Sequence, residues 1–362
     1  MKLETYIQSL VKKEIVPGIS LLVGQQGEIL HSSWHGFRSL TPEKEPLEPD
    51  TIYDLASLTK PLVTAFLAVY LREKTGLDLH SPVKAFFPDF TRPVTWMHLL
   101  THTSGLPAWY PFYLFTGEDF PAITFIHRLN PRHRPGEKVV YSCVGYMLLR
   151  RMIEKVTGQE FQKTAQEIIF QRLALKNTFF SVPAERIHQT APTEKGNLHE
   201  KNMCRKNFGR RAAEFAWRET IIRGQVHDAN SFYFGGCAGN AGLFSTTADL
   251  FKISREFFPE TSTILSPESI RLFWTDCIGG GPSRRTVGFK LNSSFLSSGG
   301  TSFSHQAIGH NGFTGTSIWL EPQTLSTWII LSNRIHPSVQ PIQFNRIRRK
   351  LHRLSKREFV GK

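Results

Sequence analysis

A serine and a lysine lie three residues apart at Ser57 and Lys60, in the stretch DLASLTK that precedes the apolar run PLVTAFLAVYL. Residues at this spacing share one face of a helix, so the lysine amine can reach the serine hydroxyl. A serine becomes a nucleophile when a neighbouring base takes its proton, and a lysine that is desolvated near other cations can be neutral enough to act as that base. The pair therefore indicates nucleophilic acyl transfer, with a helix-capping serine beside a surface lysine as the alternative.

The surroundings of Ser57 distinguish it from two other copies of the S-x-x-K pattern, which begin at Ser9 and Ser81. Neither of those copies has an apolar helix behind it. The helix expected after Ser57 carries large apolar residues around nearly its whole circumference, which predicts a buried and rigid support. Pro61 fits the first turn of a helix, so this helix is expected to begin close to Ser57, where its positive end favours developing negative charge.

Three further stretches follow in order: WMHLLTHTSGLPAW at 96–109, PGEKVVYSCVGYMLL at 135–149 and AIGHNGFTGTSIWLEP at 307–322. Together with SLTK they resemble the serine hydrolases of the class C β-lactamase and penicillin-binding-protein family, in its esterase-like and peptidase-like branch. The resemblance extends over roughly residues 1–340 and includes GQVHDANSFYFGGCAGNAGLFSTTADL at 224–250. Since the motifs follow one another in the family's order, the resemblance is specific.

The resemblance implies catalytic roles for three residues. Ser57 would be the acylated nucleophile, and Lys60 would share the role of the base with Tyr141, which stands at the tyrosine of the family's Y-x-N motif. A tyrosine with a pKa of about 10 needs a cationic neighbour to give up its proton, so Tyr141 is expected beside Lys60. The alternative is that Tyr141 only opens a core helix.

The resemblance also implies a substrate-binding strand, because H-N-G at 310–312 stands where many relatives carry K-T-G. His310 would orient the substrate or assist proton transfer, with a hydrogen-bonded turn residue as the alternative. Gly312 would let the substrate approach the strand backbone, and the amides of Ser57 and Phe313 would form an oxyanion hole.

Two departures from the family pattern bear on the substrate. Cys143 replaces the asparagine of Y-x-N, so an amide that would meet a substrate carbonyl and help hold the lysine is lost. His310 replaces the lysine of K-T-G, so the cation that would meet a carboxylate is at best a titrating imidazole. Both changes argue against efficient β-lactamase activity and leave acyl transfer intact.

We therefore expect a serine hydrolase that forms an acyl-enzyme on Ser57 and cleaves a small ester or amide, with an esterase preferred to a D-amino-acid peptidase. Two alternatives stay open: a penicillin-binding D-amino-acid peptidase or β-lactamase, and a catalytically weak binding or scaffold member of the fold.

No cofactor is expected. No metal is expected either, because His98 and His102 are not part of an H-E-x-x-H sequence, and His102 in HTSGL is interpreted as structural. Aromatic residues at 105–115 are expected either to wall an apolar acyl site or to pack in the core.

The elements that must position these residues follow from periodicity. The stretches at 18–36 and 314–334 each read as two strands joined by a turn, which predicts one antiparallel sheet built from both chain ends. Helical periodicity over 61–74, 143–157 and 160–174 predicts helices between them.

The expected fold is α/β (α+β), an antiparallel sheet flanked by helices with a mainly helical insertion, of the β-lactamase/transpeptidase type. One catalytic unit would combine a sheet region of 1–85 plus 225–362 with a helical region of 86–224. Segment 195–220 lacks clean periodicity and is expected to be an exposed excursion.

Charge and composition indicate which partners and which cellular compartment to expect. The formal net charge is +14, and the basic stretch 344–362 has helical spacing, which predicts a helix that docks on the core, with weak contact to an anionic surface as the alternative. No nucleic-acid module signature accompanies it, so no nucleic-acid partner is expected. The N-terminus lacks the apolar run of a secretory signal and the four cysteines are scattered, so a cytoplasmic location is expected.

Overall fold

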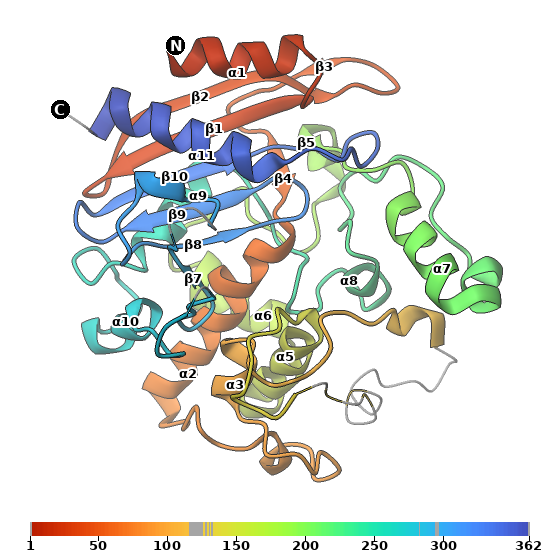
Figure 1. The fold of residues 1–362 in the computed structure, drawn as a ribbon, viewed down its shortest axis with the longest axis vertical. Helices are drawn as coiled ribbons and strands as arrows, with labels where there is room; N and C mark the ends of the chain where they lie inside the picture. Colours follow the sequence, from red (N-terminus) through yellow and green to blue (C-terminus); the bar gives the residue numbers. More distant parts are fainter. Residues whose placement is uncertain are drawn as a thin grey trace.

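The protein was analysed as a computed structural model that describes residues 2–115, 126, 129, 131, 133–281, 283–293 and 297–360. Its largest sheet has seven strands in the order β3-β2-β1-β10-β9-β8-β7, and every neighbouring pair is antiparallel (Figure 1). The strands are β1 (Gly18–Gln25), β2 (Glu28–Ser39), β3 (Glu45–Pro46), β7 (Lys290–Leu291), β8 (Ile308–Asn311), β9 (Ser317–Glu321) and β10 (Ser326–Leu331). The predicted fold class, with a sheet built from both ends of the chain, is confirmed.

Strand β1 joins the two ends of the chain because it pairs with β2 on one side and β10 on the other. Its run ISLLV is buried on both faces, which explains why its apolar residues are continuous instead of alternating. The β1–β2 turn places Gln26 and Gly27 at positive φ (52° and 85°), as a two-residue type I′ hairpin requires.

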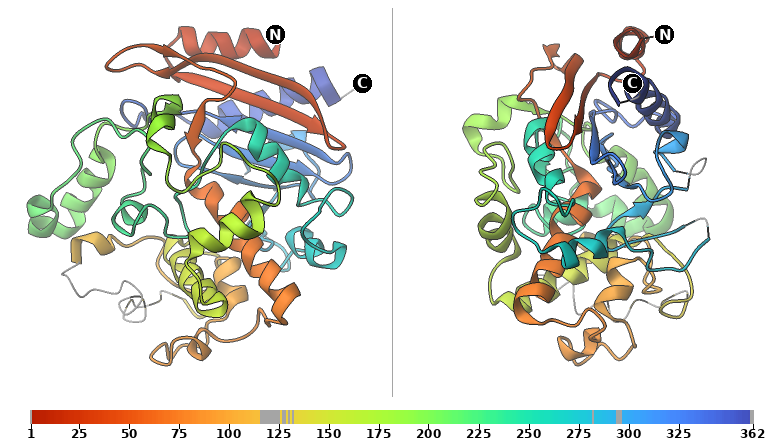
Figure 2. Two further views of the ribbon diagram at one scale, coloured as in Figure 1. Left: turned by 180° about the vertical axis from the view of Figure 1, so that it is seen from behind. Right: turned by 90° about the vertical axis from the view of Figure 1, so that its left-hand side faces the viewer.

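One face of the sheet is covered by the first and last long helices, α1 (Leu3–Lys12) and α11 (Phe344–Ser355), which lie side by side (Figure 2). Ile347, Leu351 and Leu354 of α11 join a buried apolar cluster with α1 and the sheet. The predicted docking of the basic C-terminal helix on the core is therefore confirmed.

His352 of α11 lies wholly inside this layer, and neither ring nitrogen has a hydrogen-bond partner among the described residues. Burial, reinforced by Arg348, lowers the pKa of His352 to about 3. The unfolded chain takes up the proton near pH 6.5 but the folded one does not, so stability contributed by the neutral ring is lost as pH falls below 6.5.

As the pH falls from 6.5 to 5, the wild type should lose about 2 kcal/mol more of its unfolding free energy than the His352→Leu variant. The figure follows from about 1.4 kcal/mol for each pH unit. Urea unfolding at both pH values measures the difference. The exposed His305 supplies the control, since His305→Leu should keep the wild-type pH dependence. Equal pH dependence in the wild type and His352→Leu would contradict a buried neutral ring.

The other face of the sheet packs on helices and on a small three-stranded sheet of order β5-β4-β6. These strands are β4 (Ile52–Asp54), β5 (Thr190–Ala191) and β6 (Phe244–Ser245). The helices are α2 (Phe66–Thr75), α3 (Trp96–Leu100), α5 (Cys143–Thr157), α6 (Phe161–Ala165), α8 (Ala229–Tyr233), α9 (Thr247–Arg255) and α10 (Pro267–Trp274). The helices expected over 61–74 and 143–157 are confirmed, and the one over 160–174 comprises α6 and a π-helical turn at Gln166–Phe170.

Segment 195–220 stands away from the body of the molecule, as expected, but it contains a helix that its periodicity did not predict (Figure 1). Helix α7 (Leu198–Glu214) has non-helical backbone at Gly209 and buries only Glu200, Cys204 and Ala212. So small a buried face leaves little apolar periodicity to recognise. Within the described part of the chain, no helix is both long and apolar enough to cross a membrane.

Candidate active site

The Ser57 hydroxyl accepts a hydrogen bond of 2.9 Å from the Lys60 amine. Lys60 is completely buried, and it also donates to the Asn240 backbone carbonyl at 2.8 Å. Ser57 is half-buried in a 3-10 turn at Ala56–Leu58, and a π-helical turn at Lys60–Ala65 continues into α2. The predicted reach of lysine to serine at a helix start is present in the structure.

The charge of Lys60 differs from the sequence-based expectation of a neutral lysine. Burial by itself would lower the Lys60 pKa, but the neighbouring Cys143, Tyr141 and Asp228 outweigh burial and raise the pKa above its usual value. Lys60 is therefore an ammonium at neutral pH and donates to Ser57. The expectation failed because it counted desolvation without the acidic groups that tertiary packing brings to the amine.

Tyr141 lies at the start of α5 with its ring centre 5.0 Å from the Lys60 nitrogen, as expected. The Arg285 guanidinium lies 5.7 Å from the same ring centre. Both cations therefore lie next to the Tyr141 ring. Cys143 is two residues further on, and burial raises the pKa of its thiol despite the nearby Lys60.

His102, interpreted as structural from the sequence, holds both neighbours of Tyr141. Its backbone carbonyl accepts from the Val140 amide at 2.8 Å, and its ring Nδ1 accepts from the Ser142 amide at 3.0 Å. Its ring packs on Tyr141 with centres 4.5 Å apart, and its φ of 60° is unusual for a residue other than glycine. Burial, with Arg285 and Lys60 nearby, keeps the pKa of His102 well below its usual value, so Nδ1 remains an acceptor.

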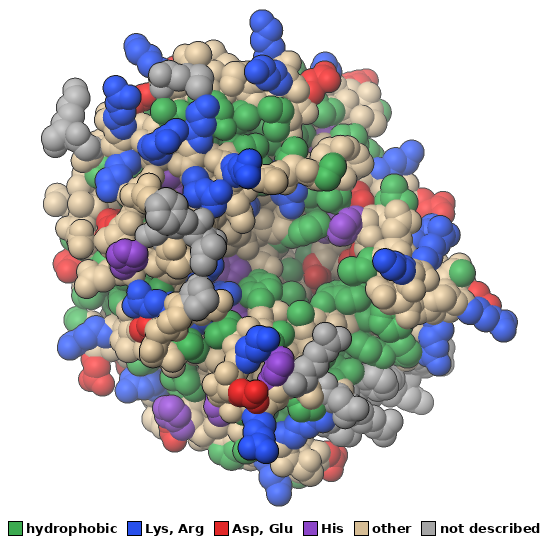
Figure 3. All heavy atoms as spheres, in the orientation of Figure 1, with side chains coloured by type: hydrophobic (Ala, Val, Ile, Leu, Met, Phe, Trp, Pro, Cys, Tyr) green, Lys and Arg blue, Asp and Glu red, His purple; other side chains and the backbone are tan. Residues whose placement is uncertain are grey.

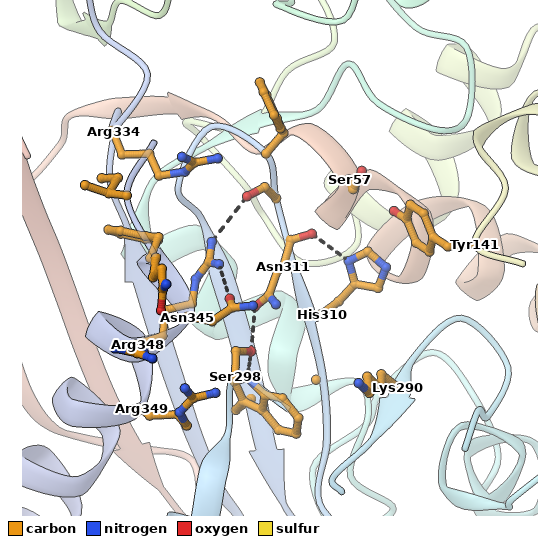
Figure 4. Close-up of a pocket in the computed structure, with 18 of the residues that line it drawn as sticks. Ser57, Tyr141, Lys290, Ser298, His310, Asn311, Arg334, Asn345, Arg348 and Arg349 are labelled. Carbon is orange, nitrogen blue, oxygen red and sulfur yellow. Dashed lines mark hydrogen bonds between the residues drawn. The ribbon is translucent and has the colours of Figure 1, made fainter. Parts of the chain in front are cut away.

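His310 on β8 lines the same cleft as Ser57 and Tyr141 (Figure 4). Its Nδ1 donates to the Asn311 carbonyl at 3.0 Å, which leaves Nε2 as a buried lone pair without a partner among the described residues. Burial, with Lys60 and Arg285 close by, keeps the pKa of His310 well below its usual value. The imidazole is thus neutral at pH 7, which corrects the expectation of a titrating one.

The loop after β8 is tied to the backbone that leads into Ser57. The hydroxyls of Thr314 and Thr316 donate to the carbonyls of Asp54 and Leu55 at 2.7 and 3.0 Å. A Cβ at Gly312 would lie 2.5 Å from the Leu55 carbonyl oxygen and would overlap the Thr316 hydroxyl, so the close approach requires glycine. Phe313 in this loop lines the same cleft as Ser57, and its amide has no backbone or side-chain acceptor among the described residues.

Asp54 and Asn240 are positioning residues that sequence reasoning missed. The buried Asp54 carboxylate accepts from the Ala56 amide at 2.8 Å and from the His227 amide at 2.7 Å, and so holds Ala56 at a φ of 47° just before Ser57. Asn240 accepts from Lys60 through its backbone. Asp54 opens the quoted DLASLTK stretch, but nothing in one sequence indicates that its partner lies 173 residues away.

Ser57, Tyr141 and His310 open into a cleft of about 720 Å³. Figure 3 shows a hollow near the centre of this face, with Lys and Arg side chains gathered over α11 and hydrophobic side chains towards α7. Among the described residues that line the cleft, none is Asp or Glu and six are cationic: Arg285, Lys290, Arg334, Arg346, Arg348 and Arg349. The Phe313 ring borders it, with His227 stacked at 5.6 Å and the Arg334 guanidinium at 5.3 Å.

The aromatic residues at 105–115 do not line this cleft, and Phe112 packs in the main core. Tyr113 and Trp109 join a cluster with Phe208 and Phe215, which supports the core-packing alternative. Among the described residues, no group of three or more His, Cys, Asp or Glu side chains is arranged to hold a metal ion.

All the residues predicted for the site therefore meet at one place: Ser57, Lys60, Tyr141, Cys143, His310, Gly312 and Phe313. They come from three separate stretches of the chain: the turn before α2, the start of α5, and β8 with the loop that follows it. The arrangement can activate a serine hydroxyl next to a strand edge and a free backbone amide.

Comparison with known proteins agrees with this geometry. The family described as Beta-lactamase matches residues 3–351. A protein of Escherichia coli (strain K12), provisionally named D-alanyl-D-alanine carboxypeptidase, is 28% identical over 366 residues, covering 91% of this chain and 81% of that protein. The N-acetylmuramyl-L-alanine amidase of Bacillus subtilis (strain 168) is 27% identical over 377 residues, covering 92% and 82%.

Among solved structures, EstCE1, described as a hydrolase with promiscuous acyltransferase activity, superimposes with a TM-score of 0.76. The match covers 97% of each chain at 17% sequence identity. At this identity the similarity concerns the fold.

Proposed function

Since the chain belongs to the beta-lactamase family of serine hydrolases, we propose that it cleaves small amides or esters through an acyl-enzyme on Ser57. The observation that carries the proposal is the hydrogen bond between Ser57 and a buried, charged Lys60, next to a tyrosine that faces two cations. In the proposal Tyr141, which lines the same cleft as Ser57, takes the serine proton, so Lys60 does not have to be neutral.

In the proposed reaction, Ser57 Oγ forms a bond to the substrate carbonyl carbon while its proton passes to the Tyr141 oxygen. Lys60 stays an ammonium. In the proposal it stabilises the Tyr141 phenolate before the proton transfer and the Ser57 oxygen during the proton transfer. The oxyanion accepts from the amides of Ser57 and Phe313. The carbon–nitrogen or carbon–oxygen bond then breaks, the leaving group takes the proton from Tyr141, and water repeats the sequence to release the acid.

The two relatives are both named for cleavage of amide bonds, so we propose amides of short peptide-like molecules as substrates alongside esters. The neutral His310 in place of a lysine and Cys143 in place of an asparagine speak against efficient β-lactam turnover. Intact Ser57, Lys60 and Tyr141 speak against a catalytically weak scaffold. Contact of α11 with an anionic surface, the cytoplasmic location and the domain division at 86 and 224 stay predictions.

The proposal is tested by intact-mass spectrometry after incubation with a fluorophosphonate and, separately, with a penicillin. A phosphonate adduct that maps to Ser57 is expected, and a penicillin adduct that persists would assign the chain to the penicillin-binding peptidases instead of the esterases. No phosphonate adduct on folded protein would overturn the proposal.

His102 yields a prediction about the positioning of Tyr141. His102→Ala removes the acceptor for the Ser142 amide and is expected to lower kcat by about tenfold to a hundredfold with KM nearly unchanged, because a displaced base costs rate more than binding. His102→Asn keeps a side-chain acceptor near the Nδ1 position and tolerates a positive φ, so it should recover most of kcat. Equal loss in both variants at unchanged thermal stability would contradict this positioning role.

A further inference from the structure

The described residues that line the cleft include six cationic side chains and no Asp or Glu. None of Arg285, Lys290, Arg334, Arg346 and Arg348 forms an ion pair with a described residue. The first turn of α11 also borders the cleft and contains no acidic residue, although a helix start favours negative charge. Most ordinary basic surfaces are interspersed with acidic side chains, and this wall is not.

Arg348 is the least solvated of these cations, with 4% of its surface exposed. Its guanidinium donates to the carbonyls of Gly312 and Thr316 at 3.2 and 2.8 Å, and to the Asn345 side chain at 2.9 Å. Its Nε has no partner among the described residues. A buried cation without a counter-ion is costly, so an anion bound in the cleft would remove part of that cost.

The cations form two groups. Figure 4 shows Arg334 and Arg348 on one side of the strand that carries His310 and Asn311, and Lys290 on the other side. Arg285 belongs with Lys290, because the two residues pair across an isolated bridge. Guanidinium and ammonium groups bind carboxylate and phosphate oxygens through charge-assisted hydrogen bonds, and one such anion would not neutralise both groups.

Phe313 also lines the cleft. Its ring lies 5.3 Å from the Arg334 guanidinium and stacks on His227, whose Nε2 is 2.9 Å from the Glu194 carboxylate. An anionic portion of a substrate would be attracted to the cations along β8 and α11.

We propose that the substrate of this site carries at least two anionic groups, which are carboxylates or phosphate. Both bind along β8, one beside Arg285 and Lys290 and the other beside Arg334 and Arg348. The inference rests on the proposed function, since it concerns the substrate of the same Ser57. One anion near β8 would neutralise only one of the two groups of cations. A second anion is inferred because the other group needs one as well.

A kinetic test compares three 4-nitrophenyl esters that differ in free carboxylates: butyrate with none, glutarate with one and tricarballylate with two. Wild-type kcat/KM is expected to rise about tenfold with each carboxylate. Arg334→Gln and Lys290→Gln should each lower the ratio of kcat/KM for the tricarballylate ester over the butyrate ester by about tenfold. Arg353→Gln, an exposed arginine of α11 outside the cleft, should leave this ratio unchanged.

A preference for the neutral ester would overturn the inference, and so would a tricarballylate-to-butyrate ratio of kcat/KM that neither cleft variant changes. Even then, Ser57-dependent hydrolysis of the butyrate ester would still support the proposed function. Calorimetric titration of the Ser57→Ala protein with tricarballylate, pyrophosphate and acetate tests binding without catalysis. Binding of a polyanion at least tenfold tighter than acetate, weakened by Arg334→Gln, supports the inference even where no ester is turned over. Tighter binding of pyrophosphate than of tricarballylate assigns phosphate, and the reverse assigns carboxylates; equally weak binding of all three would overturn the inference.

Discussion

Ser57→Ala is expected to lower kcat/KM for any turned-over ester or amide by at least about 1,000-fold, because it removes the atom that forms the acyl bond. The substitution deletes one half-buried hydroxyl, and Lys60 keeps its hydrogen bond to the Asn240 carbonyl. The variant should therefore fold with a thermal midpoint close to that of the wild type. Hydrolysis of 4-nitrophenyl butyrate and the mass of the phosphonate-treated protein measure the loss.

The matched control is Ser81→Ala, which alters the S-x-x-K copy that lies outside the site. It should keep wild-type rates and the phosphonate adduct. Residual turnover of Ser57→Ala above about 1% of the wild type, in protein free of wild-type contamination, would mean that another group attacks the substrate.

Lys60→Met is expected to lower kcat/KM by about 100-fold to 10,000-fold, the range in which removal of a general acid or base falls. Methionine fills a similar buried volume without charge, so Tyr141 loses its nearest cation and the Ser57 hydroxyl loses its donor. The Asn240 carbonyl loses a donor as well, which costs about 1–3 kcal/mol of stability. Rates and thermal midpoints of Lys60→Met and of Lys84→Met, its exposed S-x-x-K counterpart, separate the catalytic loss from the structural one.

The charge of Lys60 adds a dependence on pH. Since its neighbours raise the Lys60 pKa above the usual value, its proton stays on throughout the neutral range, and no change in kcat/KM between pH 6 and 9 should arise from its ionisation. A sigmoidal rise in that range that disappears in Lys60→Met would show that the reaction needs the neutral amine.

Local sequence patterns were enough to predict the antiparallel sheet built from both chain ends, the main helices, and the motifs that supply the site. Periodicity of apolar residues reports which face of an element is buried, and the motifs report residue types at fixed local spacing. The contact between Ser57 and Lys60 could be predicted because the two residues are one helical turn apart, so local geometry alone brings them together.

The charges of Lys60 and His310, and the residues that position the site, could be seen only once the chain was folded. Lys60 is charged because Tyr141, Cys143 and Asp228 reach it from other segments, and His310 is neutral because it is buried beside Lys60 and Arg285. The contacts of His102 with the residues on either side of Tyr141 and the gathering of cationic side chains in the cleft depend on contacts between distant segments. Such contacts leave no periodic trace in a sequence, because each depends on the shape of the surrounding core and not on the spacing of neighbouring residues.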